Sequence, residues 1–313
     1  MRIFSAPLQG YTEAPFRHFH AEVYGHCNGA ADTYYTPFIR IEHNDVRSHD
    51  IRDLLSTLNA NHCVIPQIIV RDCSEFAFLT DTIVKAGYKT IDINMGCPFP
   101  PQVNKGRGAA LVSRTEILSE ICRKMKALNS DGITFSAKMR LGVNSQEEWR
   151  DSIKILNEMP LSHITIHPRI ARQQYSGELI LDELTAFIDN TSHPIVFNGD
   201  IHTPEDIDRI INKFPSLYAI MVGRGLLARP SIIAEWKSGK IWSKAEKITH
   251  IQALHEGIKD HYINALCGQT QILSKIKPFC EYLESEIGHK TFKAIRKATT
   301  LSKYDRAILA IGT

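Results

Sequence analysis

The sequence predicts an α/β protein, a TIM (β/α)8 barrel followed by a small C-terminal helical bundle. Three observations support this fold class. Eight short apolar runs alternate with amphipathic stretches through roughly the first 240 residues. Polar residues or glycines follow nearly every apolar run at its carboxyl end. Beyond Trp242 the strand-like runs stop, and helical periodicity dominates the rest of the chain.

The apolar runs are rich in β-branched residues and have the length of strands, at 3–6, 31–35, 64–70, 90–94, 134–139, 163–167, 194–198 and 219–222. Helical periodicity is clearest between them at 74–86, 116–128, 147–158, 204–212 and 226–235. Thr203 before Pro204-Glu205-Asp206 predicts a helix start, because an N-cap is followed by proline and acidic residues. Eight such units in about 240 residues fit a closed parallel barrel better than an open sheet.

The C-terminal part of the chain has helical patterns at 245–265, 273–286 and 292–300. A linker-like segment lies near 238–244, so we expect a barrel over 1–240 and a helical domain over 241–313. The domain contains eleven Lys or Arg and seven Asp or Glu, whereas the other 240 residues carry a net charge of −1. A basic tail indicates an acidic partner, although a solvated lysine-rich helical face has the same composition.

The composition, 43% hydrophobic and 23% charged, is that of a globular chain with a large core. No apolar run reaches the roughly 18 residues of a membrane span, and the N-terminal residues do not resemble a signal peptide. The seven cysteines include no Cys-x-x-Cys pair, which argues against disulfides and structural zinc. We therefore expect a cytoplasmic protein. His18 and His20 have no third ligand at metal spacing, so we also expect no metal.

Functional side chains of a barrel enzyme lie where the strands end at their carboxyl side. In this chain such positions hold Pro7, Leu8, Gln9, Gln67, Asn94, Cys97, Lys138, Arg140, His167, Arg169, Asn198, Gly199, Asp200, Gly223 and Arg224. We therefore expect one active site at the mouth of the barrel. The glycine turns after the last two strands are typical of a phosphate site, to which Arg224 adds a fork of donors.

The segment Asp92-Ile93-Asn94-Met95-Gly96-Cys97-Pro98 brings an amide, a glycine turn and a thiol into a small volume. Cys97 could act as a nucleophile with His167 as its base, or as a general acid that stays protonated at neutral pH. We favour the acid, because a redox cofactor site is also predicted. The loop that follows, with Lys105 and Arg107, looks basic and mobile.

Lys138 lies among apolar residues near the end of the fifth strand, where lysine is uncommon. Three interpretations remain open at this point. The amine could form a Schiff base with a carbonyl substrate, as in an aldolase. It could stabilise the polar edge of a flavin, with Gln67 on the same heterocycle. It could also form an ordinary salt bridge in the barrel mouth.

With these residues considered together, the chain resembles the tRNA-dihydrouridine synthase family. The resemblance covers residue 3 to beyond 280 and rests on seven segments, Ala6–Gly10, Gln67, Asp92–Pro98, Lys138–Gly142, His167–Arg169, Asn198–Ile201 and Met221–Gly225. It implies an FMN-binding barrel, a tRNA-binding helical tail, and reduction of a uridine to 5,6-dihydrouridine with NADPH as reductant. Hydride would pass from flavin N5 to C6, and Cys97 would deliver the proton to C5.

The resemblance also assigns the other residues. FMN would be bound by Pro7, Leu8, Gln9, Gln67, Lys138, His167, Asn198, Gly199, Asp200, Gly223 and Arg224. The tRNA substrate would be bound by Asn94, Lys105, Arg107, Arg140, Arg169 and Arg172. The segment 276–283 is most similar to the subfamily that modifies uridine 16 of the D-loop. We expect a monomer without metal or membrane association.

Three positions depart from the family pattern, in which Leu8 is usually Met, Pro168 is usually Gly and Ile170 is usually Thr. Proline fixes φ and removes a donor, so the loop after the sixth strand could differ from the family. Three other functions remain as alternatives. They are an FMN-dependent barrel oxidoreductase acting on a small pyrimidine-like substrate, an RNA-binding protein without activity, and a Schiff-base aldolase that uses Lys138.

Overall fold

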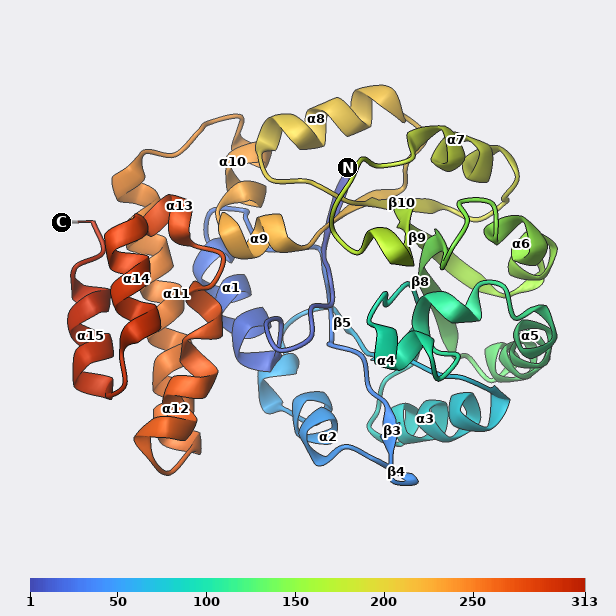
Figure 1. Cartoon of the computed structure of the whole chain (residues 1–313), viewed down its shortest axis with the longest axis horizontal. Helices are drawn as coiled ribbons and strands as arrows, with labels where there is room; N and C mark the ends of the chain where they lie inside the picture. Colours follow the sequence, from blue (N-terminus) through green and yellow to red (C-terminus); the bar gives the residue numbers. More distant parts are fainter. Residues whose placement is uncertain (313) are drawn as a thin grey trace.

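The computed structural model describes residues 1–312 and confirms the predicted barrel (Figure 1). Nine strands form one parallel sheet in the order β5-β2-β1-β11-β10-β9-β8-β7-β6. They are β1 (Arg2–Ser5), β2 (Thr33–Tyr35), β5 (Val64–Ile65), β6 (Gln67–Ile68), β7 (Thr90–Met95), β8 (Thr134–Gly142), β9 (Leu161–Ile170), β10 (Ile195–Asn198) and β11 (Ala219–Val222). The two edge strands, β5 and β6, are halves of the third predicted strand, so the sheet closes on itself.

Prolines explain where the observed elements differ from the predicted ones. Pro66 divides the third strand, because proline cannot donate a ladder hydrogen bond. Pro230 divides the helix expected over 226–235 into α9 (Arg224–Ala228) and α10 (Ile232–Ser238). Pro278 similarly interrupts the helix expected over 273–286. The start at Thr203 is confirmed, since its side chain accepts a hydrogen bond from the Asp206 backbone N–H.

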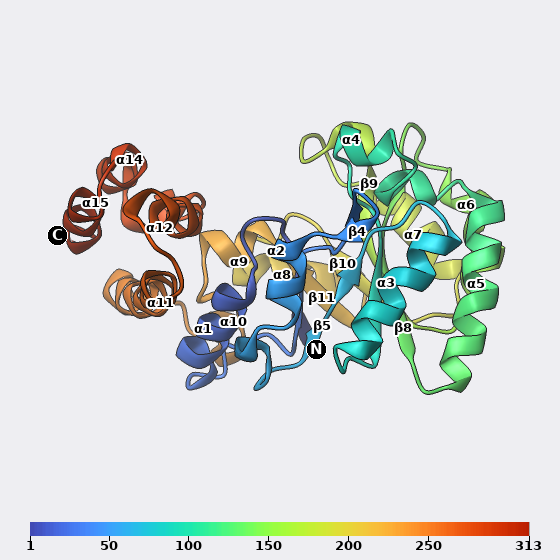
Figure 2. The same cartoon turned by 90° about the horizontal axis from the view of Figure 1, so that it is seen from below.

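The barrel is surrounded by helices that follow the strands in sequence (Figures 1 and 2). They are α1 (Ala14–Gly25), α2 (Ser48–Leu54), α3 (Cys73–Lys85), α5 (Thr115–Ser130), α6 (Trp149–Glu158), α7 (Leu181–Asp189) and α8 (Pro204–Lys213), with the short α4 (Pro100–Val103) and a small hairpin of β3 (Ile41–Glu42) and β4 (Asp45–Val46). Every residue of β10 and β11 is buried, as expected for strands covered on both faces. One core cluster includes Ala6 and Met221, which also line the cavity described below.

The tail consists of α11 (Lys244–Ala265), α12 (Gln269–Ile276), α13 (Glu284–Ile287), α14 (His289–Lys297) and α15 (Leu301–Leu309). Figure 2 shows these helices together at one end of the molecule, next to α1. Helix α11 packs along α1. Among residues 1–312, no helix combines the length and the apolar character that a membrane crossing requires.

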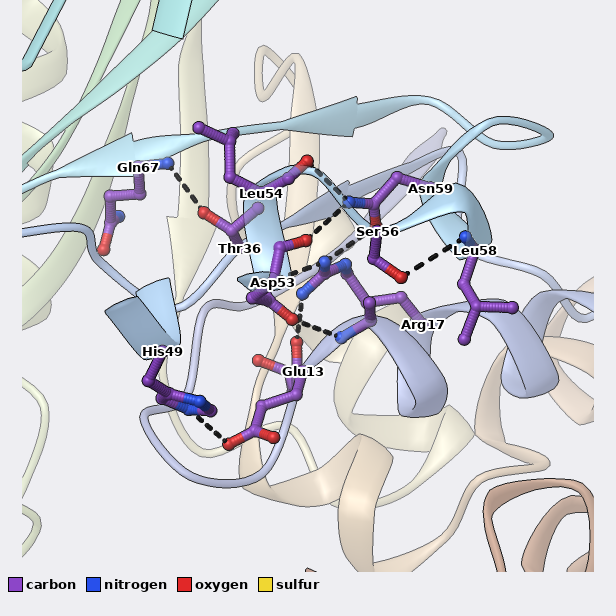
Figure 3. A network of polar contacts seen from close by, with 12 residues as sticks. Glu13, Arg17, Thr36, His49, Asp53, Leu54, Ser56, Leu58, Asn59 and Gln67 are labelled. Carbon is purple, nitrogen blue, oxygen red and sulfur yellow. Dashed lines mark hydrogen bonds and ion pairs between the residues drawn. The ribbon is translucent and has the colours of Figure 1, made fainter. Parts of the chain in front are cut away.

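A buried ionic cluster around Glu13 joins the barrel to the tail. The Glu13 carboxylate accepts hydrogen bonds from Lys275 Nζ at 2.9 Å and from the Tyr262 hydroxyl at 3.0 Å, and both donors belong to the tail. On the barrel side, His49 Nε2 lies 3.0 Å from the same carboxylate. Figure 3 shows Glu13 and His49 beside a second network, in which the buried Arg17 bonds to Asp53.

The Glu13 cluster predicts an acid-sensitive contribution to stability. Burial by itself would raise the Glu13 pKa, but hydrogen bonds and charges from His49 and Lys275 lower it from 4.5 to about 2. A lowered acid pKa stabilises the fold above the unfolded value and loses that effect as pH falls toward 2. We expect Glu13→Gln to cost about 3 kcal/mol at pH 7 and about half of that or less at pH 3, measured by urea unfolding. An equal cost at both pH values would contradict this prediction.

Candidate active site

A cavity of about 480 Å³ lies at the carboxyl ends of the barrel strands, where the sequence predicted a site. Most of the predicted site residues line this cavity, namely Pro7, Leu8, Gln9, Asn94, Cys97, Lys138, Arg140, His167, Asn198, Gly199, Asp200, Gly223 and Arg224. They come from both halves of the barrel and are brought together only by its closure. The volume lies within the range of about 300–1,000 Å³ that is typical of ligand pockets.

The turn that carries Cys97 is held by the amide of Asn94. Its Oδ1 accepts hydrogen bonds from the backbone N–H groups of Gly96 at 3.1 Å and Cys97 at 2.8 Å. Its Nδ2 donates to Gln67 Oε1 at 2.8 Å, which fixes the orientation of the amide. Gly108 packs behind the thiol with φ of +61°, and a Cβ there would lie 2.7 Å from the Cys97 carbonyl oxygen. The position of Cys97 is therefore set from two sides.

A polar chain continues from Asn94 into the barrel. Gln67 donates to Asp92 Oδ2 at 2.6 Å, and the Ser136 hydroxyl donates to Asp92 Oδ1 at the same distance. Burial raises the Asp92 pKa to about 6, although both donors oppose the shift. Gln67 is fully buried and does not line the cavity. Its observed contacts are thus with Asn94 and Asp92, which orient the Cys97 turn from below.

The electrostatics of the cavity favour a protonated thiol at Cys97. Burial raises the thiol pKa, and the opposing effects of the Phe99 backbone and the nearby cations are smaller. Burial also keeps the His167 pKa well below its usual value, with further contributions from Arg140 and Lys138. No hydrogen bond joins Cys97 to His167 among residues 1–312. The surroundings of Cys97 therefore favour a general acid over an activated nucleophile.

Lys138 reaches the cavity without a partner in the described part of the chain. Its Nζ makes neither a hydrogen bond nor an ion pair with any residue from 1 to 312, so the salt-bridge interpretation is wrong. Burial lowers the Lys138 pKa to about 8, with a further contribution from the charge of Arg140. An unpaired, desolvated ammonium group favours an anionic or electron-rich ligand beside it.

The ends of β9, β10 and β11 bring guanidinium groups together around Asp200. Arg169 Nη1 donates to Asp200 Oδ1 at 2.9 Å, and Arg224 Nη2 donates to the same oxygen at 3.3 Å. Burial would raise the Asp200 pKa, but Arg169 and Arg224 together lower it. Arg140 and Arg224 also lie over the ring of Tyr175, at 5.4 and 4.3 Å. Positive charge thus exceeds negative charge here, which favours a phosphate.

Gly225 allows the two phosphate-side loops to approach each other. A Cβ at this position would lie 1.8 Å from the carbonyl oxygen of Ile201. The glycine turn after β11 therefore packs directly against the loop after β10, as the predicted pair of turns requires.

Four of the predicted tRNA-binding residues lie outside the cavity lining. Arg169 is buried against Asp200, whereas Lys105 and Arg172 are exposed. Arg107 differs most from the expectation of a mobile basic loop. It is 3% exposed, pairs with Glu75 of α3 and donates to the Ile41 carbonyl oxygen at 3.2 Å. Its guanidinium group is therefore satisfied inside the protein, and we withdraw Arg107 as an RNA contact.

Several aromatic residues at the mouth were not predicted. Tyr175 follows β9 and is half exposed at the cavity rim, as is Phe99 beside Cys97. Tyr282 comes from the tail and packs edge-to-face on Tyr11, with ring centroids 5.2 Å apart. The position of Tyr175 after a barrel strand was a usable signal. No sequence signal places Tyr282 at the cavity, because only the tertiary fold brings the tail to the cavity mouth.

A closed parallel barrel with a cationic cavity at its carboxyl end defines a barrel enzyme that binds an anionic ligand. The profile of the family described as "Dihydrouridine synthase (Dus)" matches residues 4–307. This chain belongs to that oxidoreductase family, and the predicted family resemblance is confirmed at this level.

Curated relatives agree with this assignment, and a solved structure shares the fold alone. A probable tRNA-dihydrouridine synthase of Staphylococcus aureus (strain Mu50 / ATCC 700699) is 29% identical over 233 residues, covering 72% of this chain and 68% of the relative. Probable tRNA-dihydrouridine synthase 2 of Bacillus subtilis (strain 168) is 26% identical over 265 residues, covering 82% and 78%. The old yellow enzyme from Trypanosoma cruzi shares the fold, with a TM-score of 0.51, 11% identity, and coverage of 77% and 89%.

The family implies a flavin cofactor, and the cavity residues fit one. The unpaired ammonium of Lys138 suits the polar edge of a ring that becomes negatively charged on reduction, and the cluster around Arg224 suits a phosphate. These two groups approach the same cavity from different strands, β8 and the end of β11.

Proposed function

We propose that this protein reduces a uridine in the D-loop of tRNA to 5,6-dihydrouridine, with FMN in the cavity and NADPH as the reductant. The observation that carries the proposal is a half-buried thiol with a raised pKa, Cys97, in one cavity with the unpaired Lys138. Reduced FMN, when bound, would supply the hydride for uracil C6. The similarity of segment 276–283 to one subfamily supports uridine 16 as the target.

The side chains that line the cavity have different roles in the proposed reaction. Cys97 holds a proton on Sγ and delivers it to uracil C5, and Asn94 fixes the turn from which the thiol projects. Lys138 and His167 would hold the ring system of the cofactor, whereas Arg224 and the glycine turns would hold its phosphate. Because burial favours the neutral thiol, Cys97 stays available as an acid at neutral pH.

The tRNA substrate requires that a stacked base leave its helix, which costs a few kcal/mol. The exposed rings of Phe99 and Tyr175 at the cavity mouth support this step, because aromatic faces stack unpaired bases. In the tail, helix α14 presents Lys290, Lys293 and Lys297 to solvent, and none of them forms an ion pair among the described residues. Such a row suits an RNA backbone.

The proposal is tested by nucleoside mass spectrometry of unmodified tRNA incubated with flavin-loaded protein and NADPH. A uridine that gains two hydrogens establishes the reaction, and nuclease mapping of the same sample places it at position 16 or elsewhere. Conversion of a free pyrimidine, with no product in tRNA, would instead identify a small-molecule oxidoreductase.

Neutralising the α14 row should weaken tRNA binding without altering the cavity. We expect Lys290→Ala/Lys293→Ala/Lys297→Ala to raise the KM for tRNA and to reduce the slope of log affinity against log salt by about 2. The rate at which NADPH reduces the bound flavin should not change. The matched control is Arg123→Ala/Lys124→Ala/Lys154→Ala on α5 and α6, at the end of the molecule opposite the tail (Figure 1). Equal effects in both triple variants would contradict the assignment of this surface.

The pKa of Lys138 predicts how FMN binding depends on pH. In the protein without ligand this pKa is lowered to about 8, so the ammonium charge is lost as pH rises above that value. We expect the affinity of the apoprotein for FMN, measured by fluorescence quenching, to fall between pH 7 and 9.5. In Lys138→Met the affinity should be lower and nearly constant over this interval. Parallel profiles for the two proteins would show that Lys138 does not contact the cofactor.

A further inference from the structure

A second cluster of chemically active side chains lies outside the cavity. His18 and Glu22 are one turn apart on α1, and therefore on one face of that helix. His62 joins them from the segment just before β5. The three side chains offer donor atoms that all lie within 4.8 Å of one another. The sequence did not reveal a third ligand, because His62 is distant in the chain and only the fold brings it to α1.

The geometry of the two imidazoles is close to that of metal ligands. His18 Nδ1 lies 3.1 Å from His62 Nε2. Zinc–nitrogen bonds of about 2.0–2.1 Å at a tetrahedral centre place two ligand nitrogens about 3.3–3.4 Å apart. A shift of a few tenths of an ångström would therefore suffice for both nitrogens to share one ion.

The surroundings of the cluster also suit a metal. The Glu22 carboxylate forms no hydrogen bond or ion pair with any residue in the range 1–312, so its charge is available. The hydrogen bond between His18 Nδ1 and His62 Nε2 already turns the two rings toward each other.

We propose that His18, Glu22 and His62 bind one divalent transition-metal ion of the zinc class. Two imidazoles and one carboxylate leave a fourth tetrahedral position for water or for another side chain. His261 of α11, although it interacts electrostatically with His18, is not part of the cluster of donor atoms, so we assign this position to water. None of the three ligands lines the catalytic cavity.

The position of the site defines its role. Helix α1 belongs to the barrel and packs along α11 of the tail, and His62 precedes β5 at the amino end of the barrel. The ion thus joins α1 to the segment before β5, beside the contact with the tail. It stabilises the folded chain and takes no part in the reaction, because an ion that binds only the folded state raises stability by mass action.

The test is titration of untagged, chelator-treated, flavin-loaded protein with ZnCl2 by calorimetry, and with CoCl2 by visible spectroscopy. We expect one equivalent to bind and the thermal midpoint to rise. His18→Gln and His62→Gln should each weaken binding by more than about tenfold, since even the loss of an outer partner costs that much. His26→Gln, at the exposed end of the same helix, is the matched control and should bind normally.

Two further readouts distinguish this site from metal binding at exposed thiols and from a loss of folding. Glu22 is exposed, so Glu22→Gln should fold normally, keep its activity and still lose affinity for zinc. The cobalt spectrum should lack thiolate charge-transfer bands, which would appear if the exposed Cys63 or Cys267 bound the ion. Absence of binding, thiolate bands, or equal affinities in His18→Gln and His26→Gln would each overturn the proposal.

Discussion

Replacing Cys97 with alanine is expected to reduce the rate of dihydrouridine formation by about 10²–10⁴-fold, the usual contribution of a positioned general acid. Burial keeps the thiol protonated by raising its pKa, whereas it keeps His167 neutral by lowering the pKa of the imidazole. Single-turnover nucleoside analysis with pre-reduced enzyme measures this step directly. Cys97→Ser, which retains a weaker acid, should lose less activity than alanine.

The control for this prediction is the reductive half of the cycle. The Asn94 amide binds the backbone N–H groups of Gly96 and Cys97, and neither depends on the thiol. Flavin content and the rate of flavin reduction by NADPH should therefore match those of the unmodified protein. An alanine variant that forms dihydrouridine within tenfold of the normal rate would show that another group delivers the proton.

Replacing Arg107 with methionine should destabilise the protein by up to about 3–5 kcal/mol, because one partner of a buried ion pair is removed. Glu75 is only 4% exposed, and Arg107 Nε donates to Glu75 Oε2 at 3.0 Å. The change would leave the buried Glu75 carboxylate with the exposed Arg71, whose Nε lies 3.1 Å from Oε1, as its remaining cationic partner. Urea unfolding of the flavin-free proteins measures the loss.

Lys105 provides the matched control, since it lies two residues away and is exposed. Lys105→Met should change the free energy of unfolding by no more than about 0.5 kcal/mol. Arg107 also lies next to Gly108, which packs against Cys97, so Arg107→Met should lower activity as well. If Lys105→Met and Arg107→Met had the same free energy of unfolding, the Arg107 side chain would be exposed to solvent, as the sequence predicted.

The features that the sequence predicted correctly depend on local patterns. Alternating apolar runs and amphipathic stretches marked the barrel, and barrel geometry then placed Asn94, Cys97 and Lys138 in one cavity. The interruptions at Pro66, Pro230 and Pro278 were also local, but the apolar periodicity around them outweighed the prolines.

The features that could not be predicted depend on pairing between distant segments. The sequence predicted a solvent-exposed Arg107, because no neighbouring residue indicates its ion pair with Glu75. Tyr282 reaches the cavity mouth, and His62 reaches α1, only after the chain has folded. Gln67 was assigned to the flavin, whereas its observed contacts place it beneath Asn94.

The central claim, that this cavity reduces uridine within tRNA, is tested most directly by the oxidative half-reaction. Protein reduced with NADPH is mixed without oxygen with unmodified tRNA, and flavin absorbance is followed by stopped flow. We predict rapid reoxidation, one flavin for each dihydrouridine formed, and a much slower reaction for Cys97→Ala. Reoxidation by a free pyrimidine but not by tRNA would contradict the claim and identify a small-molecule reductase.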